Sequence, residues 1–157
     1  IEEGMKTVRT VHKNPVWKNV ALAVKQPWAS LICSGIKDIE NRTWQTDYRG
    51  RLYIVASSTN VNSGFDQNMF APEILKAVEV AVTNGQIADI HTLPQSAVIG
   101  YVDIVDCTGE VVDSIWSCGS LAEGNINWKL DNAHVFEQPL LPGFKAKLNL
   151  FEIPELD

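Results

Sequence analysis

The sequence predicts a fold of the α+β class that is mainly β, a small antiparallel β-barrel or half-open sheet with short helices at its mouth. Three observations support this prediction. Six or seven short segments have the alternation or apolar character of strands, whereas only two have the apolar spacing of a helix. Helices do not alternate with strands in the second half of the chain. A doubly wound α/β protein, the alternative suggested by the strand, helix and strand at the beginning, would require that alternation.

The first strand is expected at residues 20–25, a short apolar run that a Gln-Pro pair ends. Pro27 suits the first turn of a helix, because its missing N–H has no partner there in any case. Residues 28–32 carry an apolar stripe at helical spacing, and Gly35 suits the left-handed conformation that ends a helix. The sequence therefore predicts a helix of barely two turns directly after the first strand.

The segment after this helix is predicted to be extended over residues 36–44. Alternate side chains of an extended chain point to opposite faces. Glu40 and Arg42 would therefore share one face, and Thr43 would lie on the other. Lys37 would lie at the junction of helix and strand, where we expect its charged form to pair with Glu40.

The remaining elements follow from turn residues and apolar periodicity. A loop rich in Ser, Asn, Gly and Asp is expected at residues 58–71. Pro72 then opens a second helix, which Asn84-Gly85 closes. Further strands are predicted at residues 51–57, 97–106, 110–112, 126–130, 134–136 and 145–153.

Charge is distributed unevenly along the 157 residues, whose net charge is −6. Residues 1–51 hold nine basic residues against five acidic ones, net +4, and the remainder carries net −10. A protein that coats nucleic acid through phosphate contacts alone is normally basic overall. The charge pattern therefore leaves two interpretations open, a local basic face for one nucleotide or a short single strand, and a merely solvated N-terminal half.

Three cysteines and three histidines give no sign of a metal centre or a disulfide framework. Cys33, Cys107 and Cys118 are odd in number and form no CxxC pair, and the histidines are scattered singly. The sequence contains no glycine-rich phosphate-binding loop of the P-loop or Rossmann kind. We therefore expect no metal and no cofactor, and the cysteine pattern favours a reducing, cytoplasmic location.

We expect one domain at residues 20–157, preceded by an N-terminal extension at residues 1–19. The first four residues are acidic and polar, unlike a secretory signal, and Met5 is the expected natural start. Apolar runs are far shorter than the roughly 20 residues that span a membrane. We therefore expect no membrane partner.

Polar and aromatic residues suited to a nucleobase pocket gather within residues 24–58. Aromatic rings stack on bases, amides and carboxylates read base edges, and Lys or Arg binds phosphate. The residues alone leave a second interpretation open, in which Trp28 belongs to the core and Lys37 forms a solvated ion pair with Glu40.

The pattern GxKxxExR, from Gly35 to Arg42, lies between the blocks QPWA and RGRLYI. With these flanks, the chain resembles the ASCH (activating-signal-cointegrator homology) domain family of the PUA-like superfamily over roughly residues 20–153. The resemblance implies a small PUA-like antiparallel β-barrel surrounded by short helices, with the motif on the floor of a cleft. It also implies that the domain binds RNA or modified nucleotides.

The resemblance further implies an enzymatic alternative. Some small bacterial members of the superfamily are amidohydrolases that deacetylate N4-acetylcytidine, with a lysine at the position of Lys37, a threonine and a glutamate. Others are ribonucleases. The position of that threonine is Glu40 in this chain, and Glu110 and Glu123 are only loose candidates for the glutamate.

Three hypotheses follow: a domain that binds RNA or a modified nucleotide or nucleoside, a hydrolase acting on a modified nucleoside or on RNA, and a protein-interaction domain in which the motif braces the barrel. Lys37 and Glu40 would be the catalytic pair only in the second. The residues expected to contact the ligand are Gln26, Trp28, Lys37, Glu40, Arg42, Ser57, Ser58 and Trp128.

Overall fold

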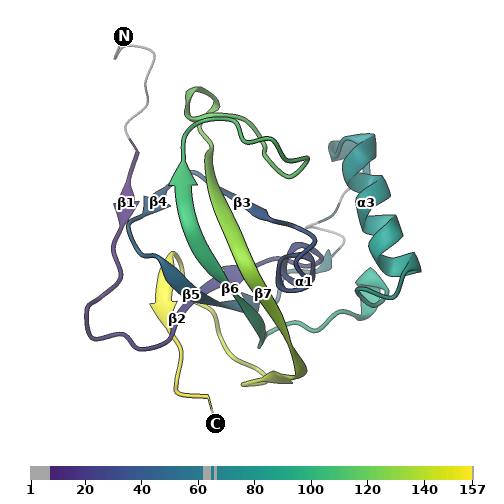
Figure 1. Cartoon of the computed structure of the whole chain (residues 1–157). Coiled ribbons are helices and arrows are strands. Elements are labelled where there is room, and N and C mark those ends of the chain that lie inside the picture. The colour runs from purple at the N-terminus through teal and green to yellow at the C-terminus, as the bar shows by residue number, and fades with distance from the viewer. Residues whose placement is uncertain (1–7, 62–64, 66, 157) are drawn as a thin grey trace.

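A six-stranded sheet that curls into a half-barrel is the main element of the computed structural model, which describes residues 8–61, 65 and 67–156 (Figure 1). The strand order is β3-β7-β6-β5-β2-β8, and every pairing in this sheet is antiparallel except that of β2 with β5. A separate parallel pair joins β1 to β4. The strands are β1 (Thr10–Val11), β2 (Val20–Val24), β3 (Ile39–Arg42), β4 (Gln45–Thr46), β5 (Gly50–Ala56), β6 (Ala97–Thr108), β7 (Ile126–Leu140) and β8 (Leu150–Glu152).

The prediction of a mainly β fold with few helices is therefore confirmed. β3 and β8 form the two edges of the sheet, so the barrel is half open, and the doubly wound alternative is wrong. The helices described are α1 (Trp28–Cys33), α3 (Pro72–Thr83) and the single-turn helices η2 (Gln67–Met69), η3 (Ile90–Thr92) and η4 (Leu121–Glu123). Of these, none has the length and apolar character that crossing a bilayer requires.

Both predicted helices end as their glycines indicated. Gly35 has φ +84° and Gly85 has φ +74°. After α1, the N–H of Gly35 donates to Ile32 O at 3.1 Å, and the N–H of Ile36 donates to Leu31 O at 3.1 Å. This pair of bonds is a Schellman motif. It turns the chain sharply and starts the segment that carries Lys37 and β3.

Helix α1 lies between two hydrophobic clusters. Ile32 and Cys33 pack with the inward-facing side chains of the sheet, whereas Leu31 packs with Val78 of α3 and with Trp116. Figure 1 accordingly shows α1 between the sheet and α3. One short helix therefore joins the main core to the smaller cluster beneath α3.

One strand prediction is wrong, and two others describe parts of a single longer strand. Residues 110–112 form no strand, because the backbone there bonds to nearby side chains: Glu110 N donates to Thr108 Oγ1 at 3.1 Å, and Val112 N donates to Ser117 Oγ at 3.2 Å. The two strands expected at 126–130 and 134–136 are one strand, β7. Asn132 has φ +54°, and shifts of register against β6 absorb the irregularity that resembled a break.

Two further strands are shorter than predicted. Of the segment expected at 145–153, only β8 is a strand, and the extended segment expected at 36–44 is a strand only from Ile39 to Arg42. The backbone bends at residues 43 and 44, directly after β3. Alternation of side chains therefore stops at Arg42.

Gly100 of β6 is a point of close approach. A Cβ built there would overlap the carbonyl oxygen of His134 on β7 and would lie 2.9 Å from Cys33 Sγ of α1. Its backbone φ is not in the left-handed region, so any residue could adopt this conformation. Glycine is required here because a side chain would collide with its neighbours. Gly100 therefore lets α1 lie directly on the sheet.

We predict that Gly100→Ala lowers the free energy of unfolding by about 3 kcal/mol, because backbone and helix must separate to admit the methyl group. Gly85→Ala is the control: nothing lies within 4 Å of its Cβ, and only its positive φ costs about 1 kcal/mol. Urea denaturation of both variants checks this order. Equal losses would contradict the proposed packing of α1.

Candidate functional site

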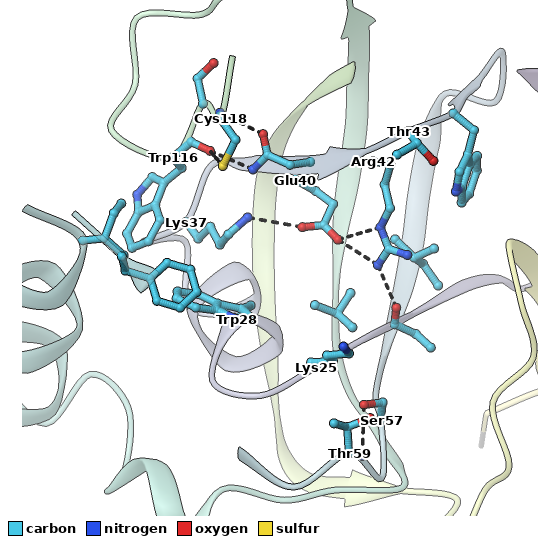
Figure 2. A pocket seen from close by; sticks show the side chains of 18 of the residues that line it. Lys25, Trp28, Lys37, Glu40, Arg42, Thr43, Ser57, Thr59, Trp116 and Cys118 are labelled. Carbon is cyan, nitrogen blue, oxygen red and sulfur yellow. Dashed lines mark hydrogen bonds and ion pairs between the residues drawn. The ribbon is translucent and has the colours of Figure 1, made fainter. Parts of the chain in front are cut away.

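A cavity of about 870 Å³ opens beside the GxKxxExR segment. Its walls come from β2, α1, β3, the start of α3 and two loops, at residues 115–118 and 147–149. Figure 2 shows Lys37, Glu40 and Arg42 in a row along one side of the pocket, with Trp28 and Trp116 next to Lys37 and with Lys25 and Ser57 across from Glu40 and Arg42.

An ion-paired trio forms the floor of this cavity. Lys37 Nζ lies 3.2 Å from Glu40 Oε1, and Arg42 Nε and Nη2 lie 2.9 and 2.8 Å from Glu40 Oε2 (Figure 2). The alternation of β3 puts Glu40 and Arg42 on one face, and the Schellman turn after α1 brings Lys37 beside them. The expected pairing of Lys37 with Glu40 is thus present.

Burial makes this trio electrostatically strong. The side chains of Lys37 and Glu40 are only 7% and 10% exposed, which rules out a solvated surface pair. Burial alone would raise the pKa of the Glu40 carboxyl, but the charges and hydrogen bonds of Lys37 and Arg42 outweigh it and lower that pKa below its ordinary value. Glu40 is therefore an ionised carboxylate at neutral pH.

The two cations retain hydrogen-bond donors beyond those that Glu40 uses. Lys37 Nζ also donates to Ile39 O, which leaves one of its three N–H groups. Arg42 Nη2 donates to Ala23 O at 2.8 Å, and within the described residues Arg42 Nη1 has no partner. The floor therefore presents donors, whereas both carboxylate oxygens of Glu40 are occupied.

An aromatic cluster lies beside Lys37 at one end of the cavity (Figure 2). The ring of Trp28 lies 5.0 Å from that of Phe70, 5.6 Å from that of Phe65 and 6.4 Å from that of Trp116, all in tilted or edge-to-face geometry. Asn41 holds the loop that carries Trp116, because its Nδ2 donates to Trp116 O at 2.8 Å and its Oδ1 accepts from Cys118 N at 3.0 Å. The strand that supplies the floor thus also positions this wall.

Cations outnumber carboxylates around the cavity. Lys25, Lys37, Arg42 and Lys147 line it, against Glu40 and Glu73. In the part of the chain that the structure describes, neither Lys25 nor Lys147 has a carboxylate partner. The surroundings of the cavity are therefore locally positive, although the chain carries net charge −6.

Five of the eight residues expected to contact a ligand line this cavity: Trp28, Lys37, Glu40, Arg42 and Ser57. The other three, Gln26, Ser58 and Trp128, lie outside it.

The structure shows where each of these three residues lies instead. Gln26 is buried, donates to Pro94 O at 2.9 Å and accepts from Ser30 N at 3.0 Å, so it ties the start of α1 to a loop. Ser58 is exposed beyond the end of β5. Trp128 is fully buried, packs edge to face on Trp44 with ring centres 4.9 Å apart, and donates to Trp44 O at 3.1 Å.

Thr43 corrects one expectation. It lines the cavity instead of facing away, because the chain bends directly after Arg42. The two loose candidates for a second carboxylate, Glu110 and Glu123, lie outside the cavity. Glu123 forms a capping box with Ser120 at the start of η4.

Several lining residues were missed from the sequence. They lie on loops far along the chain from the motif, and they include Phe70, Trp116, Cys118, Lys147 and Leu148. An isolated tryptophan in the polar segment around residue 116 was the one available signal. Burial raises the pKa of the Cys118 thiol, so it is not an activated nucleophile. Within the described residues, no cluster of His, Cys, Asp and Glu could hold a metal ion.

Several known proteins share sequence or fold with this chain. Activating signal cointegrator 1 from Homo sapiens is 34% identical over 90 residues, and its counterpart from Mus musculus is 33% identical over 90 residues. Each match covers 57% of this chain but only 14% of the relative, so the chain corresponds to a small part of these proteins.

A crystal structure of a mutant ZmASCH protein from Zymomonas mobilis aligns with 90% of this chain and 92% of that one, with a TM-score of 0.47 and 13% identity. The family model described as the ASCH domain matches residues 22–140, which include the whole cavity floor. Because this match covers well over half of the chain, the protein belongs to the ASCH domain family.

Proposed function

We propose that this ASCH domain binds RNA or a modified nucleotide in the cavity beside its GxKxxExR motif. The observation that carries the proposal is the composition of that cavity: a floor of buried, paired charges with spare donors, one aromatic wall and a cationic rim. Nucleotides combine a flat aromatic base with a phosphate, and each part has a suitable surface here.

The aromatic wall suits the base. Trp28 is half-buried and stands with Phe70 and Trp116 on one side of the cavity. Stacking of one base on an aromatic side chain contributes about 1–3 kcal/mol in single-strand-binding proteins. Ring contact of this kind tolerates a modified base, because every base has a π-face.

The floor suits oxygen atoms of the ligand. Since Glu40 already accepts from both cations, it is poorly placed to accept from a base. The spare N–H of Lys37 and the free Nη1 of Arg42 would donate to a carbonyl or phosphate oxygen. Glu40 then acts as the brace that holds the two donors.

Hydrolysis of an amide on a modified nucleoside, or of RNA, is a second candidate function. One observation favours it, namely that Thr43, which carries a hydroxyl, lines the same cavity as Lys37 and Glu40. However, a carboxylate whose two oxygens both accept from cations is a weak proton acceptor, and its lowered pKa agrees with that. Binding without turnover is therefore the better-supported function.

The first test incubates the full chain with ordinary and modified nucleosides, including N4-acetylcytidine, and with short RNAs, and follows retention and conversion by mass spectrometry. We expect retention without conversion. Arg42→Lys should weaken retention by about tenfold or more, because lysine keeps the charge but loses the planar fork. Lys25→Ala should weaken it less, and Lys76→Ala, outside the cavity, should not change it.

Two other outcomes would change the assignment. Conversion by the parent protein, lost in Lys37→Met, would make the protein a hydrolase. Neither retention nor conversion would leave the motif as a structural brace and would direct the search to protein partners. Far-UV circular dichroism of each variant separates lost binding from lost folding.

Glu40→Gln should lower the free energy of unfolding by about 3 kcal/mol at neutral pH, because Lys37 and Arg42 lose their carboxylate while they stay partly or fully buried. The pKa of Glu40 is lower in the folded state than in the unfolded state. Its stabilising effect is therefore complete above the unfolded value, about 4.3, and is lost as the pH falls below it.

Urea denaturation between about pH 5 and pH 3 checks this pH dependence. The parent should lose stability more steeply than Glu40→Gln over that range. Glu73→Gln, which removes an exposed carboxylate from the same cavity, is the matched control and should behave like the parent. Parallel curves for the parent and Glu40→Gln would show that the carboxylate gains nothing from its two cations.

A further inference from the structure

We infer that the cavity holds one nucleotide of a longer single strand, whose backbone continues over Lys147 and Lys145 into a second hollow of the surface. This inference rests on the proposed function and extends it from a single nucleotide to an oligonucleotide. The observation behind it is that Lys147 lines both hollows.

The second hollow has a volume of about 830 Å³ and lies beside β8. Its walls come from the segment before β2, the segment that leads to β8 and the residues after β8. Residues 147–149 line the first cavity, whereas residues 144, 145 and 147 line the second. One short segment of chain is therefore the boundary that a ligand would cross between the two.

The charges of the second hollow leave two cations available. Glu152 Oε2 accepts from the backbone N–H of Lys18 at 3.1 Å, and Glu155 lies 3.9 Å from Lys18 Nζ. Lys145 and Lys147 are exposed, and neither has a carboxylate partner within the described part of the chain. These two lysines are the sites at which phosphates would bind.

The segment that carries the two lysines is fixed at both ends. Phe144 N donates to Ser96 O at 3.0 Å, and the Phe144 ring stacks on that of Phe151 at 6.0 Å. At the other end, Asn149 Oδ1 accepts from Arg9 at 3.1 Å. Lys145 and Lys147 are thus held in place without being buried.

The spacing of the lysines suits a nucleic-acid backbone. Residues 144–147 belong to no helix, strand or turn, and because Lys145 and Lys147 are two positions apart, their Cα atoms lie at most roughly 7 Å apart. Successive phosphates of an extended single strand lie at a similar separation. Next to Lys147, the side chain of Leu148 is 88% exposed and also lines the cavity, which offers an apolar surface to the neighbouring base.

The test uses the full chain and compares cytidine monophosphate with oligocytidylates of three, six and ten nucleotides. Each ligand competes against a fluorescein-labelled oligocytidylate hexamer. We expect the hexamer to bind at least about tenfold tighter than the mononucleotide, with little further gain at ten. Lys145→Ala should weaken binding of the hexamer several-fold at low salt and leave binding of the mononucleotide unchanged. It should also reduce the slope of log K against log salt concentration by about 0.7, the value for one phosphate contact on a single strand.

Lys147→Ala should weaken both ligands, because Lys147 belongs to both hollows. Lys76→Ala is the charge-matched control: this lysine is exposed on α3, outside both hollows, and should change neither affinity nor slope. A hexamer that binds no tighter than the mononucleotide, or equal losses for Lys145→Ala and Lys76→Ala, would overturn the extended path and leave the single-nucleotide proposal intact. Absence of binding by every ligand here, together with no retention of any nucleoside or RNA in the first test, would overturn both.

Discussion

The structure depends on keeping one carboxylate ionised inside the protein. A buried charge without partners costs several kcal/mol, so Glu40 demands that two cations and their supporting carbonyls be placed around it. Three neighbouring elements meet this demand: the turn after α1 places Lys37, β3 places Arg42, and β2 offers Ala23 O to the guanidinium. The result ties the edge strand β3 to β2, although three strands, β7, β6 and β5, separate them in the order of the sheet. The half-open barrel is thus bridged by charge where it lacks backbone pairing.

Elements set by local chemistry were predictable from the sequence. Pro27, Gly35, Pro72 and Gly85 mark helix ends through backbone preferences that act within a few residues, and both helices lie where these residues put them. The breaks in strands were not predictable in the same way. Whether Asn132 interrupts a strand depends on whether β6 can shift its register, and that is a property of the pairing between two distant segments.

In the candidate site too, the residues set by local structure were predictable and those set by distant contacts were not. The trio of Lys37, Glu40 and Arg42 could be anticipated because one strand face and one turn bring it together. Its walls could not, because Trp116 and Lys147 reach the cavity through hydrogen bonds and packing that join loops separated by many residues. Trp128 was predicted to contact the ligand, but it packs in the core against Trp44, and its sequence position alone did not distinguish these two roles.

The position of α1 between two hydrophobic clusters has a consequence for local stability. The sheet and α1 share the larger cluster, whereas α3 is held by the smaller one, through Val78 and Ala81 and partly buried neighbours. Regions with fewer buried apolar contacts open at a lower free energy than the global unfolding of the protein. We therefore expect the wall that begins at Phe70 and continues into α3 to open at a lower free energy than the sheet does. Its amide protons would then exchange with solvent sooner than those of β5 and β6, and the cavity would widen without unfolding of the barrel.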